Sequence, residues 1–116
     1  MSEGLQTLLE RNLPLPDVAA ACARLPDRTF FSRCYSNWFT TTVLEQLVGR
    51  FAEAADGLGH HGIKPVRLCW VFECARVHAA LRPDGACLAL FVANRPGAPD
   101  DELGAVLDQF VGLAAL

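Results

Sequence analysis

The segment RVHAALRPDGACLALFVA, residues 76–93, constrains the fold of this chain more than any other. Two runs rich in aliphatic residues flank the tetrapeptide RPDG at 82–85, which is a strong signal for a tight turn. The segment therefore predicts a β-hairpin with arms over 76–81 and 86–93. It contains no acid–base pair, glycine-rich phosphate loop or obvious cluster of metal ligands, so its apolar character needs a structural explanation.

Composition favours a cytoplasmic protein that associates with other chains. The 116 residues fit one domain, yet 52% are apolar and 20% charged, with a mean hydropathy of +0.23. A small domain leaves part of that apolar material at its surface, as an obligate oligomer does before assembly. A net charge of −3 without a basic stripe argues against nucleic acid, and no run approaches the length that spans a membrane. The N-terminus lacks the apolar core of a signal peptide. The five cysteines are therefore expected to be reduced thiols in the core.

The first third of the chain predicts a helix and a hairpin. Leu5, Leu8 and Leu9 recur at helical spacing before the prolines that follow. The segment VAAACARL, 18–25, favours a helix by its alanine content. The segment TFFSRCY, 29–35, has strand composition and follows a turn at Pro26. If 29–35 is one arm of a hairpin, 18–25 must be the other.

A long helix begins near Thr40 and is expected to end at about Asp56. The tetrapeptide TVLE at 42–45 matches a capping box, and Gly57 and Gly59 are stop signals. On a helical wheel the apolar side covers about half the circumference, wider than one sheet contact requires, so a second partner is expected. This side comprises Val43, Leu44, Leu47, Val48, Phe51, Ala52, Ala54, Ala55 and Leu58.

The remaining segments complete the element order. Residues 66–72, VRLCWVF, predict a strand with Val66, Leu68, Trp70 and Phe72 on one side. After the hairpin, the acidic residues 100–102 begin a last helix, where negative charge complements the helix dipole. Its apolar stripe is Leu103, Val106, Leu107, Phe110, Val111 and Ala114. The succession α-β-β-α-β-β-β-α predicts an α/β (α+β) sandwich, with a five-stranded antiparallel sheet and helices on both faces.

This pattern resembles the roadblock family, which includes dynein light chains and bacterial regulators of small Ras-like GTPases. The resemblance rests on the element order and on PVRLCWVFECARVHAALRPDGACLALFVA followed by DDELGAVLDQFVGLAAL. In that tail the family has a strand, an acidic residue near a turn (here Glu73), a strand, an Asp-Gly turn, a strand and a helix. The first hairpin departs from the family, because Pro26-Asp27-Arg28 replaces the Asp-Gly turn of many members. Trp38 and the pair His60-His61 have no assigned counterpart.

The resemblance implies a single roadblock-like domain over 1–116, with 18–25 as a strand and the hairpin in the middle of the sheet. It also implies a homodimer formed by the middle helix and the third strand, whose edges pair across two subunits. An otherwise open apolar edge at 66–72 agrees with that expectation. The predicted dimer interface comprises Val43, Leu44, Leu47, Val48, Phe51, Val66, Leu68 and Trp70.

Candidate chemistry in the sequence is weak. Cys69, Cys74 and His78 lack the spacing of a zinc site, and no cofactor or metal is predicted. His60-His61 lies between glycines, which is typical of a solvated loop. Arg50, on the polar side of the middle helix, is interpreted as a surface arginine. We found no P-loop or hydrolase motif, and no catalytic residue is predicted.

Two functional classes remain open at this stage. The first is a non-enzymatic homodimeric module that regulates or scaffolds a small Ras-like GTPase. The alternative is a profilin-like or PAS-like sensor that encloses a small ligand between sheet and helix. An enzyme is the least favoured class, because no convergent polar site is evident.

Overall fold

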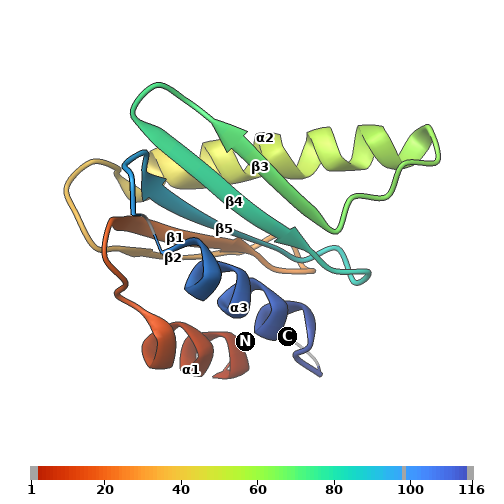
Figure 1. Cartoon of the computed structure of the whole chain (residues 1–116). Helices are drawn as coiled ribbons and strands as arrows, with labels where there is room; N and C mark the ends of the chain where they lie inside the picture. The colour runs from red at the N-terminus through yellow and green to blue at the C-terminus, as the bar shows by residue number, and fades with distance from the viewer. Residues whose placement is uncertain (1–2, 98, 115–116) are drawn as a thin grey trace.

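The structure, a computed structural model, describes residues 3–97 and 99–114 and has the predicted element order. The five strands form one antiparallel sheet in the order β2-β1-β5-β4-β3. Helix α2 covers one face, while α1 and α3 cover the other (Figure 1). The predicted fold class is therefore confirmed. The elements are α1 (Glu3–Asn12), β1 (Val18–Arg24), β2 (Phe30–Cys34), α2 (Thr41–His60), β3 (Arg67–Val71), β4 (Ala75–Leu81), β5 (Cys87–Ala93) and α3 (Asp100–Val111).

The predicted hairpin is β4 and β5, and β5 is the central strand of the sheet. Arg82 N–H donates to Ala86 O at 2.9 Å, and Gly85 N–H donates to Arg82 O at 3.0 Å. Gly85 has φ +92°, the left-handed conformation that glycine adopts at little cost. The Asp84 carboxylate accepts a hydrogen bond from Ala86 N–H at 3.0 Å. Arg82, Asp84 and Gly85 thus each have a defined role in reversing the chain.

The alanine-rich segment 18–25 forms strand β1, as the resemblance implied and against its local helix propensity. Ala20 and Cys22 contact the α2 side of the sheet, while Ala21 and Ala23 face α1 and α3. All four are fully buried. Small side chains at these positions let both helical layers approach the sheet closely. Tertiary packing therefore overrides a weak local preference.

Helix α2 differs from its prediction at both ends. The N-cap is Thr40, whose hydroxyl accepts from Val43 N–H at 3.3 Å, so the predicted capping box at 42–45 is wrong. Thr42 lies inside the first turn, where its hydroxyl cannot cap the helix. The helix also continues through Gly57 and Gly59 to His60. It ends there because Gly62, with φ +78°, supplies the left-handed residue that reverses the chain.

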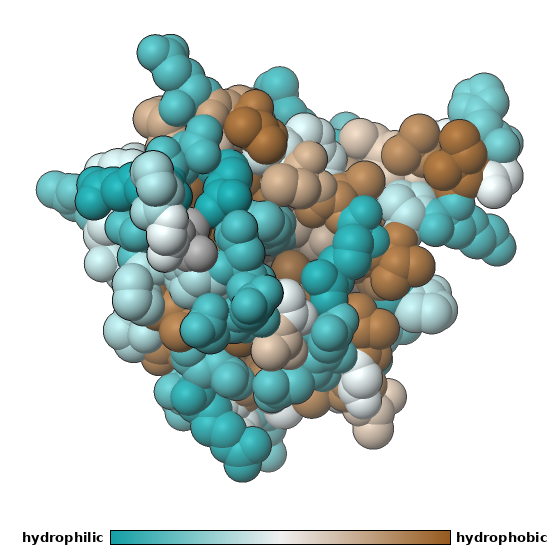
Figure 2. Space-filling model, in the orientation of Figure 1, coloured by the Kyte–Doolittle hydropathy of each residue, from teal (hydrophilic) through white to brown (hydrophobic). Residues whose placement is uncertain are grey.

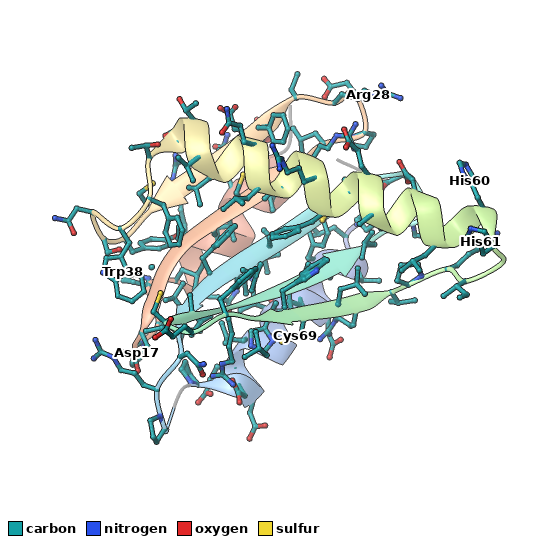
Figure 3. The ribbon with its side chains drawn as sticks, turned by 90° about the horizontal axis from the view of Figure 1, so that it is seen from above. Asp17, Arg28, Trp38, His60, His61 and Cys69 are labelled. Carbon is teal, nitrogen blue, oxygen red and sulfur yellow. The ribbon has the colours of Figure 1, made fainter. Side chains whose placement is uncertain are left out.

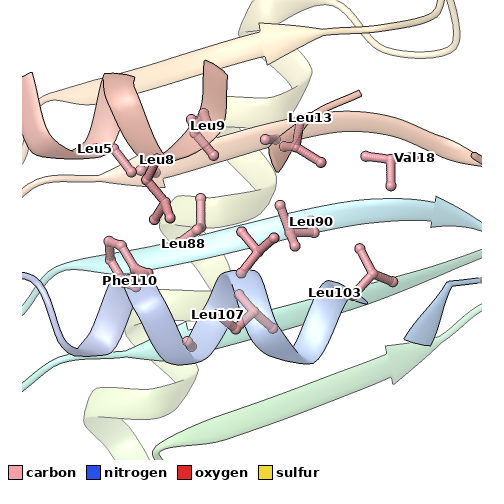
Figure 4. Close-up of a cluster of buried hydrophobic side chains, with 14 of the residues drawn as sticks. Leu5, Leu8, Leu9, Leu13, Val18, Leu88, Leu90, Leu103, Leu107 and Phe110 are labelled. Carbon is pink, nitrogen blue, oxygen red and sulfur yellow. The ribbon is translucent and has the colours of Figure 1, made fainter. Parts of the chain in front are cut away.

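The core has two layers, one on each face of the sheet. On the α1 and α3 side, leucines of both helices and Phe110 pack against β1 and β5 (Figure 4). On the α2 side, Leu44 and Val48 pack against Phe91 and its neighbours. Burial on both faces explains why β5 contains only apolar residues.

Arg82 ties the β4–β5 turn to the end of α3. Its guanidinium donates to Phe110 O at 2.7 Å and to Leu113 O at 2.8 Å. It also pairs with Asp84 at 3.0 Å, and only 7% of the Arg82 side chain is exposed. A cation at this end satisfies the last carbonyls of the helix and complements its dipole.

Candidate interaction surface

Helix α2 carries an apolar stripe that the sheet covers only in part. Leu44, Val48, Ala52 and Ala55 are buried against the sheet. The residues beside them on the wheel stay partly or fully at the surface, with Val43 at 41% and Leu58 at 36% exposure. This stripe consists of Val43, Leu47, Phe51, Ala54 and Leu58. The wide apolar arc of the prediction thus divides into a buried half and a surface half.

A stacked aromatic pair joins the stripe to the sheet. The rings of Phe51 and Trp70 lie 4.1 Å apart at an interplanar angle of 18°. Trp70 belongs to β3, and Phe51 also approaches the buried ring of Phe91 at 6.5 Å. The surface half of α2 therefore lies on the β3 side of the molecule and continues onto that strand.

Strand β3 is an edge of the sheet, because only β4 pairs with it. Phe72 N–H donates to Ala75 O, and Val66 O accepts from Leu81 N–H, so these groups face β4. Backbone polar groups alternate in direction along an antiparallel strand. The N–H and C=O groups of Arg67, Cys69 and Val71 consequently point outward. They present a short row of donors and acceptors to a partner strand.

Large exposed apolar side chains surround this edge. Val71 is 68% exposed, Val66 58%, Ile63 56% and Phe72 48%. Figure 2 shows hydrophobic residues gathered over α2 and β3, whereas the lower left of the same view is mostly hydrophilic. The α2 stripe, the outer edge of β3 and these side chains together are called the α2–β3 surface below.

The eight residues predicted for the interface occupy three environments. Leu44 and Val48 are fully buried within the chain, so they support the surface from below and offer no area to a second subunit. Val43 and Val66 are exposed. The other four, Leu47, Phe51, Leu68 and Trp70, are partly buried. The prediction omitted Leu58, Ile63, Val71 and Phe72, although Leu58 already lay on the apolar side of the wheel.

A polar cluster on the opposite face fastens α3 to β4. The Arg76 guanidinium donates to the Asp100 carboxylate at 3.0 Å and 3.3 Å. His78 Nε2 lies 3.9 Å from the same carboxylate. Burial, and then the Arg76 charge, lower the pKa of His78, while Asp100 partly opposes them. Cys69 is the cross-strand partner of His78, but no group of metal-binding side chains forms among the described residues.

The five cysteines divide by burial, which corrects the expectation of core thiols. Cys22 and Cys87 are buried, and burial raises their pKa values to about 12 and about 11. These thiols are poor nucleophiles at neutral pH. Cys34, Cys69 and Cys74 are exposed instead. Each of these three lies at an edge or an end of the sheet, where alternation or a turn directs the side chain to solvent.

His60 and His61 lie at the end of α2, far from Cys69 and Trp38 in Figure 3. His60 is the last helical residue rather than part of a loop, so that detail of the prediction is wrong. Arg50 is exposed, as expected of a surface arginine. A groove of about 720 Å³ runs between this end of α2 and the β4–β5 turn, lined in part by Asp56 and Lys64. The groove is open to solvent. Core side chains fill the space between α2 and the sheet.

The sheet order and the placement of the helices define a roadblock-type fold, and solved structures of this class superpose on the chain. Myxococcus xanthus MglB matches with a TM-score of 0.72 at 11% identity, covering 95% of this chain and 94% of that one. A Roadblock/LC7 domain from Streptomyces avermitilis matches at 0.66 and 15% identity, covering 96% and 92%. The gliding protein MglB from Thermus thermophilus matches at 0.68 and 14%, covering 95% and 87%.

The chain therefore has the roadblock fold, which confirms the predicted resemblance at the level of structure. No protein-family model matches the sequence, and no curated protein matches it either. Identities this low establish the fold alone, because one fold supports many functions. No helix in the described part of the chain is long and apolar enough to cross a membrane.

Proposed function

We propose that this chain is a non-enzymatic, homodimeric, cytoplasmic module, one roadblock-like domain over 1–116, that regulates or scaffolds a small Ras-like GTPase. The observation that carries the proposal is the α2–β3 surface, an apolar helix stripe continuous with an open strand edge. The filled space beneath α2 favours this class over a sensor that encloses a ligand. The GTPase partner is inferred by analogy with other proteins that have the roadblock fold.

The α2–β3 surface suits a second copy of the same chain. Leu47, Phe51, Ala54 and Leu58 recur at intervals of four, three and four residues, which is the spacing of a helix–helix seam. A two-fold axis brings the same patch of two subunits together, so α2 meets α2 and β3 meets β3. Such pairing would cover the open edge, which is otherwise a site for aggregation.

The dimer would give a GTPase a broad, two-fold platform. Pairing at β3 joins the two sheets, and the two α2 helices then lie on the same face of the continuous sheet. A platform of this kind can act by ordering the switch regions of a GTPase in one nucleotide state. Regulation would then require different contacts with the GTP-bound and GDP-bound forms.

Light scattering after gel filtration tests the dimer. We expect about twice the chain mass of 12.6 kDa at micromolar concentration. Leu58→Asp should give monomers, because it places a charge on the seam at a residue that is already 36% exposed. Gln46→Asp, on the polar side of the same helix, is the matched control and should remain dimeric. Phe51→Asp is less informative, since Phe51 also packs on Trp70 and Phe91.

Calorimetric titration tests the GTPase partner. The dimer would be titrated with the Ras-like GTPase from the same genome, loaded with GDP or with a non-hydrolysable GTP analogue. We expect binding to depend on the nucleotide, and single-turnover GTP hydrolysis then distinguishes a regulator from a scaffold. Equal binding to both forms would exclude a nucleotide-dependent regulator. No binding at tens of micromolar would remove the GTPase from the proposal and leave the dimer.

A further inference from the structure

Strand β2 is the second open edge of the sheet, because among the described residues only β1 pairs with it. At one end of the hairpin, Leu25 N–H donates to Thr29 O at 2.7 Å. At the other end, Tyr35 N–H donates to Ala19 O at 2.8 Å. Backbone groups alternate in direction along an antiparallel strand, so every second residue between these two points outward. The outward-facing residues of β2 are Phe30, Ser32 and Cys34.

The β1–β2 hairpin carries positive charge beside this edge. Arg28 in the turn and Arg33 on β2 are exposed, and Arg24 at the end of β1 is partly buried. Within the part of the chain that the structure describes, none of these arginines forms an ion pair. On the opposite edge, by contrast, Arg67 is paired with Asp108. The β2 edge is therefore basic, although the whole chain has a net charge of −3.

Arg28 occupies a position of the turn that glycine normally fills. Its φ is +70°, and a three-residue hairpin loop usually places glycine in this left-handed conformation. The neighbouring Asp27 carboxylate accepts from the N–H of Thr29 at 3.0 Å and from its hydroxyl at 2.6 Å, so it supports the turn. Figure 3 shows the Arg28 side chain extending from the turn into solvent. The turn thus holds a cation beside the open edge at a cost in backbone strain.

The two faces of β2 offer different side chains to an added strand. On the face that α1 and α3 cover, the Arg33 guanidinium lies 4.6 Å from the centre of the Phe31 ring. On the α2 face, Phe30 packs on the core beside Gly49 of the helix. A strand laid along β2 alternates its own side chains between these two faces. One of its faces therefore meets a cation over an aromatic ring, and the other meets an apolar side chain.

We propose that β2 accepts an extended acidic segment of a protein partner as a sixth strand of the sheet. The carboxylates of the segment lie on the Arg33 side and its apolar side chains lie on the Phe30 side. In this mode of recognition, main-chain hydrogen bonds give affinity and alternate side chains give specificity. A second copy of this chain suits the edge poorly, because self-pairing brings two copies of Arg28 and Arg33 to one seam. The inference goes beyond the proposed function and does not depend on it, since β2 and β3 are opposite edges.

Fluorescence anisotropy with the full chain tests the proposal. The probe is a fluorescein-labelled peptide, Glu-Val-Glu-Val-Glu-Val-Glu. We expect a Kd on the order of 100 μM or lower at low salt, rising as salt screens the arginines. A Lys-Val-Lys-Val-Lys-Val-Lys peptide reverses the charge, and Glu-Glu-Glu-Glu-Val-Val-Val keeps the composition without the alternation. Both controls should bind at least about tenfold more weakly. Equal binding of either control, or no binding of the probe, overturns the proposal.

Variants of the edge test its charge and its backbone separately. Arg33→Glu should raise the peptide Kd by roughly tenfold or more. Lys64→Glu is the matched control, because it makes the same change in net charge at an exposed residue before β3. It should change the Kd by less than about twofold. Ser32→Pro removes an outward N–H and should raise the Kd by about tenfold, while circular dichroism stays unchanged because an edge strand tolerates proline there. Equal losses in Arg33→Glu and Lys64→Glu contradict a site at β2.

Arg28→Gly distinguishes a binding residue from a purely structural one. The variant should raise the Kd by about threefold, because it removes one exposed cation from the site. It should also raise the thermal unfolding temperature, since glycine adopts this φ without strain. A weaker complex from a more stable fold supports the proposal. An unchanged or lower Kd in this variant excludes Arg28 from the site and overturns the basic turn as part of it.

Amide hydrogen exchange locates the added strand. On binding of the Glu-Val probe, the amides of Phe30, Ser32 and Cys34 should become protected, while those of Cys69 and Val71 on β3 should not change. Protection at β3 in place of β2 overturns the site. Protection of the β2 amides without peptide, together with a mass above that of a dimer, shows that a second copy occupies the edge and overturns the acidic partner. None of these outcomes bears on the dimer of the proposed function, which light scattering tests by itself.

Discussion

Strands β5 and β3 are both rich in apolar residues, yet they differ in how far the rest of the chain buries them. All seven residues of β5, CLALFVA, are buried, whereas those of β3, RLCWV, alternate between exposed and half-buried. The difference is position, since β5 is central under helices on both faces and β3 is an edge. Hydrophobicity therefore identifies a strand that must be covered, but it does not say whether the same chain or a partner covers it.

The largest effect is expected from removing a large side chain of β5. Phe91→Ala should lower the free energy of unfolding by about 3–5 kcal/mol, because Phe91 is 1% exposed and packs between Phe39 and Phe51. Val71→Ala on β3, where the side chain is 68% exposed, should change the stability of the monomer by less than about 0.5 kcal/mol. Urea unfolding at low protein concentration measures both. Similar losses of unfolding free energy in the Phe91→Ala and Val71→Ala variants would contradict the expected difference between β5 and β3.

Two arginines that contact α3 extend the comparison between β5 and β3. Arg82 lies in the turn before β5, and Arg67 lies on β3. Arg82→Ala in the turn before β5 should cost about 2–3 kcal/mol of stability, because its buried guanidinium holds Phe110 O and Leu113 O. Arg67→Ala on β3 should cost less than about 1 kcal/mol, since its pair with Asp108 is largely exposed. Thermal and urea unfolding check the order. An Arg67 variant less stable than the Arg82 variant would show that β3 depends on α3 more than its exposure indicates.

Proline substitutions in β3 separate pairing with the partner from pairing with β4. Cys69→Pro removes an outward N–H from each protomer and should weaken the dimer by about 2 kcal/mol, roughly 30-fold in Kd. Leu68→Pro removes an N–H that faces β4, so it should lower the stability of the monomer as well. Sedimentation equilibrium and urea unfolding distinguish the two results. If Cys69→Pro dimerised normally, β3 would not be the pairing edge.

The smallest effect is a pH dependence from β4, which lies between β5 and β3. The folded-state pKa of His78 is below its ordinary value of 6.5, because burial and the Arg76 charge disfavour the imidazolium. As the pH falls below about 6.5, the unfolded chain binds a proton that the folded chain resists. Stability should thus be fully present above that pH and should decline as the pH falls below it towards the lowered folded-state pKa of His78. His78→Gln should flatten this slope in urea unfolding, and an unchanged slope would assign the dependence to other groups.

Much of the fold followed from local patterns. The RPDG turn and the leucines of α1 lie where the sequence predicts them, and so do Leu103, Val106, Leu107 and Phe110 of the α3 stripe. Ala114, which was also assigned to that stripe, lies beyond the end of α3 at Val111 and is exposed, so that part of the prediction is wrong. The ends of α2 were harder to predict from the sequence. By residue type, either Thr40 or Thr42 can be the N-cap, and Gly57, Gly59 and Gly62 are all possible stop signals. The exposure of Cys69 and Val71 depends on which face and which edge they occupy. No local pattern encodes that choice.

Local sequence patterns were enough to predict every element except β1, together with the apolar character of β5, β3 and α2, because side-chain periodicity and turn chemistry act over a few residues. Only the tertiary structure decided that the alanines of β1 form a strand, that Leu44 and Val48 face inward, and that β3 is an open edge. These features depend on contacts between segments far apart in the chain. The α2–β3 surface arises from this arrangement, since it consists of the apolar side chains that the other elements do not cover.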